Sequence, residues 1–490
     1  MPGLKQPAVT DHRHQSSPCI PSVLSDSMSP AAVQVEDREQ EKESSPEGKS
    51  DVSTYATDDF PPASGTHSGV RSLSMFSHGG VLPTAVCLSK AAIGAGVLTM
   101  SGHAAEVGLV FQTSSLIGGA VLSLASIRFI ATACTATGCY SYEDLCDELL
   151  HPVMALFTGF MNTLNCIGSA VGYLIICGQL FGAVTGASEP QCRLFLVLTG
   201  VFVCAPLAIA RHVSCMRHLA AGSIAALLTL VACVMWYFAE HGADETIVTP
   251  DDVFFSSTAT VFTYMSGINN VVFAYNNQFN VPQLTGELKP EPSTMRMHTA
   301  AVICLIMCFS LYAFTSVFGV LAFGIGDHQK HSLVNSLKPV GRNPFVVLTM
   351  LGLMLSVLTC FQFHVYPVRQ FAAYLVRRIR KRGANTEKED KVVCGKTVTR
   401  WFDIFFALFS VAVIIFIAVV VKDLRTVLQF VGSFAAAYIA FIVPPIWLLQ
   451  VRRRSQSFCW CKAETQLCLL VLSLGIFFFA FGTYTAVLSV

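Results

Sequence analysis

The stretch SKAAIGAGVLTM, residues 89–100, lies inside an apolar run from Val81 to Val110. Lys90 stands near the start of the stretch, and Gly94 and Gly96 lie about halfway along the run. Each glycine weakens a helix by about 1 kcal/mol relative to alanine, so two glycines spaced by one residue favour an unwound turn. In a bilayer, unwound backbone is tolerated where it is buried in protein or lines a cavity. The pattern therefore indicates either close helix packing or a binding site.

The whole chain has the composition of a membrane protein. Of its 490 residues, 53% are hydrophobic and 13% are charged, whereas soluble domains carry about 25% charged residues. Apolar runs of about 20 residues, long enough to cross a bilayer, recur along the sequence. We therefore expect an all-α polytopic membrane protein with about 11 transmembrane helices. The expected spans are 81–108, 111–135, 153–185, 193–210, 216–239, 254–281, 298–323, 343–376, 401–421, 424–449 and 465–489.

Loop charges predict the orientation of these spans. With a cytoplasmic N-terminus, the inner loops contain 17 Lys and Arg and the outer loops contain 6. This bias satisfies the positive-inside rule. The segment before the first span, residues 1–78, is rich in Ser and Pro and has 11 acids and 6 Lys or Arg. We expect it to be a disordered acidic cytoplasmic arm, because its composition cannot bury enough apolar surface to fold. The transmembrane domain is then residues 79–490.

A second interrupted helix is expected in the sixth span, where residues 266–288 read SGINNVVFAYNNQFNVPQLTGEL. Several amides are followed by Pro282, which lacks a backbone donor and interrupts a helix. Intramembrane amides are costly unless they face protein, water or substrate. Because the two interrupted spans are five helices apart, the pattern predicts a five-plus-five inverted repeat with discontinuous helices 1 and 6. Half-helix N-termini favour a carboxylate and unwound carbonyls favour an amine, so this architecture suits amino acids.

Other classes of function find little support in the sequence. The 18 cysteines are scattered, mostly within apolar runs, and CWC at 459–461 is the one tight pair. We see no nucleophile–base constellation, nucleotide loop, metal cluster or basic-aromatic patch. The sequence therefore predicts neither an enzyme nor a cofactor, metal or nucleic-acid partner.

Six stretches, in order, resemble the amino acid/auxin permease family, nearest its neutral and proton-coupled amino acid transporter branches. They cover nearly all of residues 80–490. The stretches are IGAGVLTM at 93–100, CYSYEDLCDELL at 139–150, VGYLIICGQLFG at 171–182, APLAIARHVSCMRHLAAGS at 205–223, VFAYNNQFNVPQLTGEL at 272–288 and VLQFVGSFAAAYIAFIVPPIWLL at 427–449.

The resemblance implies a substrate site between the two interrupted helices. One wall would be the backbone of Ile93, Gly94, Ala95 and Gly96, and the facing wall would be Phe273, Ala274, Tyr275 and Asn276. Asn165 and Tyr173 share one face of the third span, and either side chain would reach the centre or form interhelical hydrogen bonds.

Coupling residues are expected beside this site. Lys90 lies about 14 Å into the first span, near the bilayer midplane. At the position that corresponds to Lys90, the sodium-coupled branch looks to have an asparagine that helps to hold the ion. The proton-coupled branch looks to have a lysine there, as this chain does. Lys90, with Thr359 on the eighth span, is therefore expected to take part in ion or proton coupling. The other ionisable candidates within or near the spans are His103, Glu106, His364 and Arg369.

The expected function is a secondary active or facilitative amino acid transporter that works by alternating access. Transport is expected to be sodium-independent, with protons as a candidate coupling ion. The alternatives are a membrane amino acid sensor, which binds but signals, and a sodium-coupled neutral amino acid symporter. The expected location is the plasma membrane or an acidic endomembrane compartment. The expected partners are a small amino acid and the lipid bilayer, with protons as a third candidate.

Overall fold

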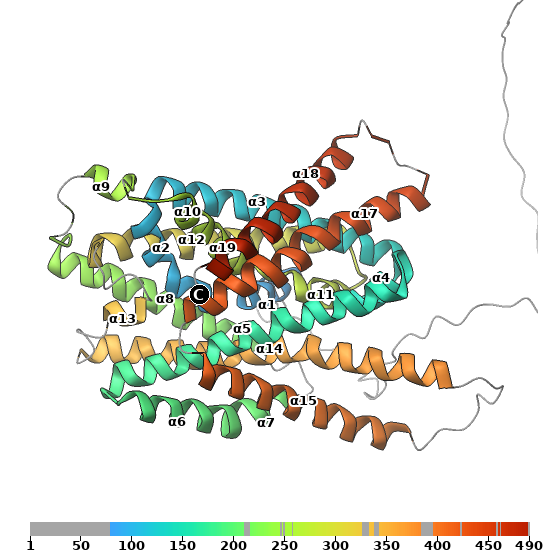
Figure 1. Ribbon diagram of the computed structural model, residues 1–490, viewed down its shortest axis with the longest axis horizontal. Helices are drawn as coiled ribbons and strands as arrows, with labels where there is room; N and C mark the ends of the chain where they lie inside the picture. The colour runs from blue at the N-terminus through green and yellow to red at the C-terminus, as the bar shows by residue number, and fades with distance from the viewer. Residues whose placement is uncertain are drawn as a thin grey trace, which may run out of the picture. The chain divides into compact units, whose positions relative to one another are not determined.

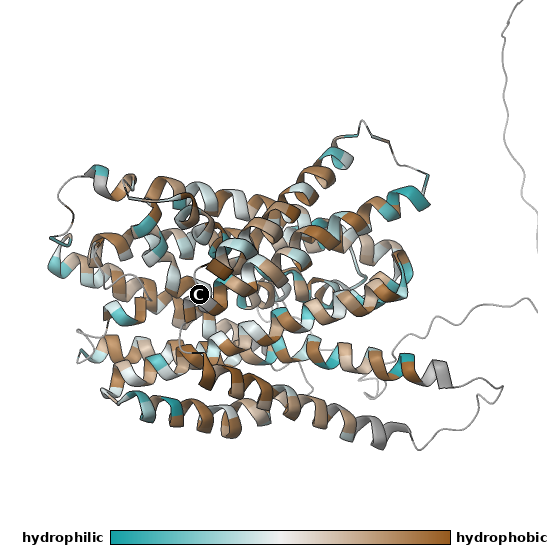
Figure 2. Cartoon of the chain, in the orientation of Figure 1, coloured by the Kyte–Doolittle hydropathy of each residue, from teal (hydrophilic) through white to brown (hydrophobic). Residues whose placement is uncertain are grey.

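The computed structural model describes residues 79–488, except 210–215, 246, 248–249, 257, 326–332, 338–342, 384–394, 422–423, 457–458 and 461. The expected arm, residues 1–78, lies outside the described residues. The described part is all-helical and contains no strand (Figure 1). Hydrophobic residues cover the long helices, and hydrophilic residues gather at helix ends and in loops (Figure 2). This confirms the fold class of a polytopic α-helical membrane protein.

Helices match the expected spans along the chain. Within the described residues, eight helices are long and apolar enough to cross a membrane, and a bent pair makes a ninth. A shorter apolar helix, Ile404–Val420, and the interrupted pair α10–α11 occupy the two remaining expected spans. The span helices are α1 (Val81–Ala92) with α2 (Met100–Val107), α3 (Leu109–Thr137), α5 (Pro152–Thr185), α6 (Glu189–Thr199) with α7 (Ala205–Ile209), α8 (Met216–His241), α10 (Val261–Ala274) with α11 (Val281–Gly286), α12 (Thr294–Phe323), α14 (Pro344–Gly383), α15 (Gly395–Val420), α16 (Leu424–Val431) with α17 (Val443–Arg454), and α18 (Ala463–Phe477) with α19 (Thr483–Leu488).

Helices five spans apart pack against each other. The second span, α3, packs along the seventh, α12, and the third span, α5, packs along the eighth, α14. The fourth span, α6–α7, contacts the ninth, α15, and the first contacts the sixth through α10. This pairing is the one expected from a five-plus-five repeat. It gives one group of helices around α3 and α12 and a second group around α5 and α14, with the two interrupted helices in the first group.

Both interrupted helices break near their middles. The first bends by 50° between α1 and α2, across Ile93 and the 3₁₀ turn η2 (Ala95–Thr99). In the sixth span, α10 ends at Ala274, and a second 3₁₀ turn, η5 (Gln278–Asn280), precedes α11. The sequence suggested that Pro282 causes this break, and that prediction is wrong. Pro282 lies in the first turn of α11, where a missing backbone donor costs little because those donors have no helical partner.

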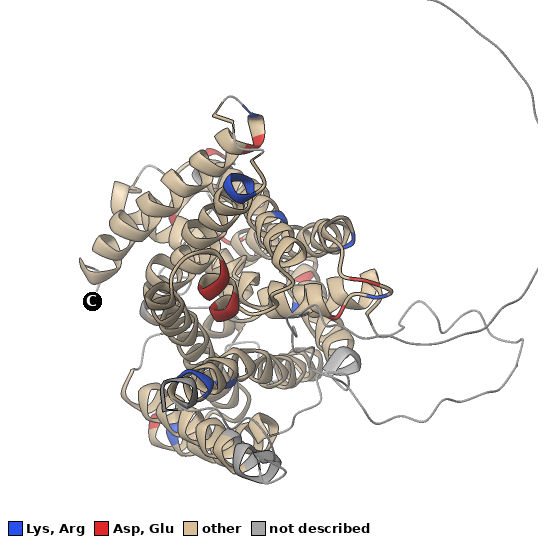
Figure 3. Ribbon diagram, turned by 90° about the vertical axis from the view of Figure 1, so that its right-hand side faces the viewer, with Lys and Arg blue, Asp and Glu red and all other residues tan. Residues whose placement is uncertain are grey.

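Three short helices lie outside the expected spans: α4 (Tyr142–Leu149), α9 (Pro250–Phe254) and α13 (Leu333–Leu337). The acidic α4 follows α3, and Figure 3 views the end of the molecule at which it lies. Its carboxylates pair with arginines on neighbouring helices: Asp144 with Arg377 (3.8 Å), Asp147 with Arg378 (3.5 Å), and Glu148 with Arg454 (2.7 Å). The short α13 packs against α5 and η2.

The residues before α1 and after α11 are joined by their backbones. The amide of Lys289 donates to the carbonyl oxygen of Gly79 at 3.0 Å. Arg296 Nη1 donates to the carbonyl oxygen of Lys289 at 2.5 Å. The beginning of the first span is therefore held to the end of the sixth span.

Candidate functional site

The break in the first span packs tightly against two other helices. A Cβ atom at Gly94 would lie 2.5 Å from the hydroxyl oxygen of Tyr173 on α5. A Cβ atom at Gly96 would lie 3.1 Å from the Cα and Cβ atoms of Ala274, the last residue of α10. Both glycines therefore permit a close approach that larger residues would prevent. Of the two alternatives that the glycine pattern left open, the structure shows close packing, and the binding site stays a prediction.

The hydroxyl of Tyr312 joins the two breaks. It lies 3.2 Å from the carbonyl oxygen of Ala92, the last residue of α1, and 2.7 Å from that of Ala274, the last residue of α10. Tyr312 extends from α12 and is fully buried. Carbonyl groups at a helix end lack an intrahelical partner. Since a hydroxyl carries a single hydrogen, the two carbonyl oxygens share it in one three-centre hydrogen bond at the point where the interrupted helices meet.

Asn165 and Asn276 form a buried amide pair between α5 and the break in the sixth span. Asn276 Nδ2 donates to Asn165 Oδ1 at 2.6 Å, and Asn165 Nδ2 donates to Asn276 Oδ1 at 3.4 Å. The two side chains, 0% and 2% exposed, therefore satisfy each other. Of the two alternatives that the sequence left open for Asn165, the structure shows the interhelical hydrogen bond.

His364 on α14 lies between Tyr173 and Phe279. Its Nδ1 is 3.1 Å from the carbonyl oxygen of Cys360, and its Nε2 is 3.4 Å from the hydroxyl of Tyr173. Since a carbonyl oxygen only accepts, Nδ1 carries a hydrogen, and in the neutral form of the ring Nε2 accepts from Tyr173. The His364 ring centroid is 5.0 Å from that of Tyr173 and 4.6 Å from that of Phe279. These three rings form an aromatic cluster beside Gly94.

Lys90 is fully buried one turn before the first break. Its Nζ donates to Ser356 Oγ on α14 at 2.5 Å, and Ser356 Oγ donates to the carbonyl oxygen of Ser223 on α8 at 3.3 Å. Cys360 Sγ donates to the carbonyl oxygen of Lys90 at 3.5 Å. Among the described residues, Lys90 forms no ion pair with an acid. The ammonium group is therefore linked to α14 by the hydroxyl of Ser356, and through it to a backbone carbonyl oxygen of α8.

Thr359 belongs to the same hydroxyl cluster. Its Oγ1 lies 2.6 Å from Ser223 Oγ and donates to the carbonyl oxygen of Ser356 at 2.7 Å. The structure thus brings the two expected coupling residues, Lys90 and Thr359, into one group of contacts centred on Ser356 and Ser223.

The remaining expected residues divide between the site and its surroundings. Ile93 and Ala274 are buried at the breaks. The Tyr275 ring packs edge-on against Tyr312, with centroids 5.5 Å apart, so it faces α12. The Cβ atom of Phe273 lies 3.0 Å from a Cβ atom placed at Gly432 of the tenth span. The side chain of Ala95 is outside the described residues.

The other ionisable candidates lie away from this site. His103 Nδ1 is 3.8 Å from Glu106 Oε2 within α2. Arg369 Nη1 donates to the carbonyl oxygen of Ala208 on α7 at 3.1 Å, which fits an anchoring position. Within the described residues, no group of three or more His, Cys, Asp or Glu side chains could hold a metal ion.

Sequence reasoning missed Tyr312, Ser356 and Asn270. Tyr312 and Ser356 are isolated polar residues in apolar spans, and no local pattern marks them. Asn270, one turn before the end of α10, is 1% exposed, and both of its amide atoms lack a partner in the described part of the chain. The sequence feature that could have indicated Asn270 is the pair Asn269–Asn270 in an apolar helix, because intramembrane amides mark functional positions.

A family model described as "Transmembrane amino acid transporter protein" matches residues 77–488. The chain belongs to the transmembrane amino acid transporter family. The match covers both interrupted helices, the Lys90 cluster and every span described above, so the resemblance seen in the sequence is confirmed.

Individual relatives in this family are distant but match over most of their length. "Vacuolar amino acid transporter 5" of Schizosaccharomyces pombe is 23% identical, over 74% of this chain and 83% of the relative. "Amino acid transporter AVT6B" of Arabidopsis thaliana is 24% identical, over 81% and 87%. "Putative sodium-coupled neutral amino acid transporter 8" of Xenopus tropicalis is 21% identical, over 79% and 86%. These relatives are transporters by name, and the chain is similar to them across the transmembrane domain.

Proposed function

We propose that this protein moves amino acids across a membrane by alternating access, with the substrate bound where the two interrupted helices meet. The observation that carries the proposal is the hydroxyl of Tyr312, which bonds carbonyl oxygens at the ends of α1 and α10. Helices broken at the same depth in two related halves form the substrate site of inverted-repeat transporters. Family membership supports amino acids as the substrate class.

The local geometry suits a zwitterion. No side chain caps the N-terminus of η2, where Gly94 is the capping residue. The backbone donors at this end favour a carboxylate, and the carbonyl ends of α1 and α10 favour an amine. Tyr173, Phe279 and His364 form the aromatic cluster beside Gly94, and we propose that they contact the substrate side chain. We propose that Tyr173 moves away from Gly94 when substrate binds.

We propose that transport does not require sodium. The Lys90 ammonium donates to the hydroxyl of Ser356 on α14, one turn before the first break, where a coupling cation would otherwise sit. A fixed positive charge there repels a sodium ion and replaces its role in holding the helices together. Proton coupling would use the same group, because a lysine that loses and regains its proton changes the charge at this point.

The test is uptake of labelled amino acids into proteoliposomes at fixed membrane potential. Sodium is replaced by a large organic cation, and the pH is stepped from 5.5 to 7.5. We expect full uptake without sodium, and a changed rate or changed pH response in Lys90→Ala. Strong sodium dependence of the native protein would favour a sodium-coupled symporter instead. A protein that binds amino acids but moves no label would be a sensor.

We propose that the N-terminus faces the cytoplasm and that the protein lies in the membrane of an acidic internal compartment. Loop charges support the orientation, and the vacuolar name of one relative supports the compartment. An N-terminal tag on intact isolated vesicles should be cleaved by added protease. A protected tag would reverse the orientation.

A further inference from the structure

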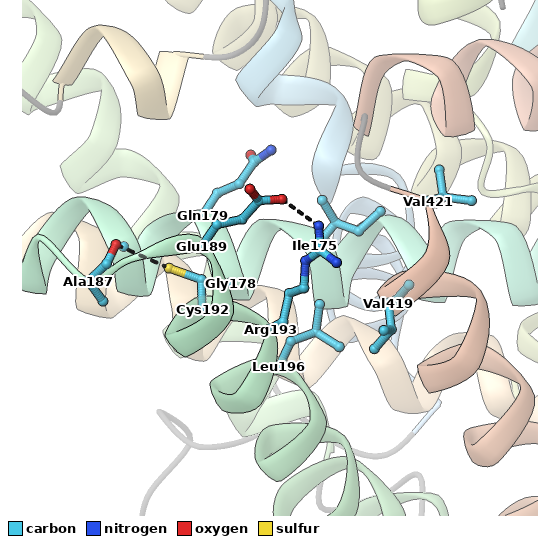
Figure 4. A pocket seen from close by; sticks show the side chains of 12 residues that line it. Ile175, Gly178, Gln179, Ala187, Glu189, Cys192, Arg193, Leu196, Val419 and Val421 are labelled. Atoms are coloured by element: carbon cyan, nitrogen blue, oxygen red, sulfur yellow. Dashed lines mark hydrogen bonds and ion pairs between the residues drawn. The ribbon is translucent and has the colours of Figure 1, made fainter.

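We propose that a cavity at the ends of α5, α6 and α15 binds an aminophospholipid of the bilayer, at a site separate from the substrate site. The cavity has a volume of about 280 Å³. Figure 4 shows its lining from the three helices, with Gln179 and Ile175 on α5, Arg193 and Leu196 on α6, and Val419 on α15.

The cavity extends from the helix ends into the membrane span. Gly182 and Ala187 line it where α5 ends and the chain turns towards α6, whereas Ile175 lines it about 10 Å further along α5. The deeper part is apolar, with Leu196 and Ala418 buried in it. A ligand that fits this shape has a polar head at the helix ends and an apolar portion directed into the span.

The polar groups at the mouth match a head group with both charges. Arg193 Nη2 and Glu189 Oε1 form an ion pair at 2.5 Å, and their side chains are 39% and 66% exposed. Gln179 Oε1 is buried and has no hydrogen-bond partner among the described residues. A phosphate would bind Arg193, and a primary ammonium would bind Glu189 and donate to the unpartnered oxygen of Gln179.

The surfaces beside the cavity favour a lipid over a soluble zwitterion. On α6, Leu194 and Leu198 are 60% and 44% exposed, and on α15, Phe416 and Val420 are 70% and 61% exposed. Large apolar side chains exposed on a membrane helix face acyl chains. The head group would therefore sit in the cavity while its acyl chains cover these two faces. A free amino acid carries the same two charges but leaves the apolar surface uncovered.

Occupancy of the cavity bears on the substrate site through α5. Ile175 lines the cavity, and Tyr173, two residues earlier on the same helix, lies against Gly94. A bound lipid that fills the space between α5, α6 and α15 holds this group of helices together. We expect it to raise both the thermal stability and the rate of uptake.

The experiment measures the melting temperature of the purified full-length protein in nanodiscs of phosphatidylcholine, with and without phosphatidylethanolamine. Native mass spectrometry of the same samples counts retained lipids. We expect phosphatidylethanolamine to raise the melting temperature and to stay bound. Arg193→Gln, which removes the phosphate partner, and Ala418→Trp, which fills the apolar part, should each lose most of this shift.

The matched control is Arg452→Gln. Arg452 forms a similar ion pair, with Glu464 at 2.7 Å, and both side chains are about one-third exposed (37% and 34%). This variant should keep the full shift. The proposal is overturned by an equal shift with phosphatidylglycerol, by an unchanged shift in Arg193→Gln, or by displacement of the lipid with soluble phosphoethanolamine or a free amino acid. None of these readouts depends on transport, so the proposed function stands or falls separately.

Discussion

At the scale of single residues, the hydroxyl of Tyr312 has a role that no other described side chain shares, because it contacts the ends of both interrupted helices. A hydrogen bond of this kind contributes about 1 kcal/mol net. Its removal leaves two buried carbonyl groups without this partner, so the effect should fall on the geometry of the substrate site.

Tyr312→Phe should therefore reduce amino acid uptake per molecule by roughly fivefold, the factor that corresponds to about 1 kcal/mol. Expression and membrane insertion should be unchanged, because the ring still fills its buried place. The measurement is initial uptake rate normalised to protein at the membrane. Tyr264→Phe is the control, since the Tyr264 ring packs on Phe111 at 4.5 Å away from the breaks. Equal rates in the two variants would contradict the role of Tyr312.

The glycines of the first break allow a second test at this scale. Gly96→Val should abolish uptake, because even a Cβ atom would approach the backbone of Ala274 to 3.1 Å. Gly118→Val on α3 is the control, since no atom lies within 4 Å of a Cβ placed there. Both proteins should reach the membrane, as checked by surface or vesicle labelling. Normal uptake by Gly96→Val would mean that the first break does not form the substrate site.

The sequence indicated part of this site and not the rest, for a physical reason. Gly94, Gly96 and Asn276 stand out because they are unfavourable in an ordinary membrane helix. Tyr312 and Ser356, in contrast, are residue types that can occur in any buried helix, so they do not stand out. Their importance comes from the pairing of α12 and α14 with the interrupted helices, which a linear pattern does not contain.

At the scale of elements, α4 contains a buried acid beside three acids that pair with arginines. Glu143 is 1% exposed, and its Cγ lies 3.1 Å from a Cβ atom placed at Gly159 on α5. Burial, and to a smaller degree the neighbouring charge of Asp144, raises the pKa of Glu143 from 4.5 to about 7. The native state therefore keeps the proton up to a higher pH than the unfolded chain does, and its stability falls as pH rises from about 4.5 to about 7.

Glu143→Gln should remove the loss of stability that the native protein shows as pH rises from about 4.5 to about 7. The variant should gain thermal stability over the native protein at pH 8, by at most about 3 kcal/mol, and the gain should shrink towards pH 5. Melting temperatures in detergent at both values measure the effect. Glu148→Gln on the same helix is the control, because Glu148 is 53% exposed and its pair with Arg454 contributes little. A gain that is equal at pH 5 and pH 8 would show that Glu143 does not titrate in this range.

The membrane spans could be predicted at this scale because each is a long apolar run of the sequence. The short helices α4, α9 and α13 could not, since five to eight residues carry too weak a pattern. The break in the sixth span was located by its amides, but its cause was misassigned to Pro282. The chain leaves the helix at Tyr275, seven residues earlier, where Asn276 turns to pair with Asn165.

At the scale of the whole molecule, a deletion can test whether the N-terminal arm, residues 1–78, takes part in transport. The acidic composition of residues 1–78 offers little surface for packing. Deletion of residues 2–70 should therefore leave uptake per molecule at the membrane within about twofold of the full chain. The measurement compares uptake normalised to inserted protein. A complete loss with normal insertion would mean that the arm is needed for transport.

The backbone bond between Lys289 and Gly79 has a mechanical consequence. It closes a loop of about 200 residues, so that α1 and α11, one half of each interrupted helix, share one attachment point. A displacement of the start of α1 would therefore be transmitted to α11 through this hydrogen bond.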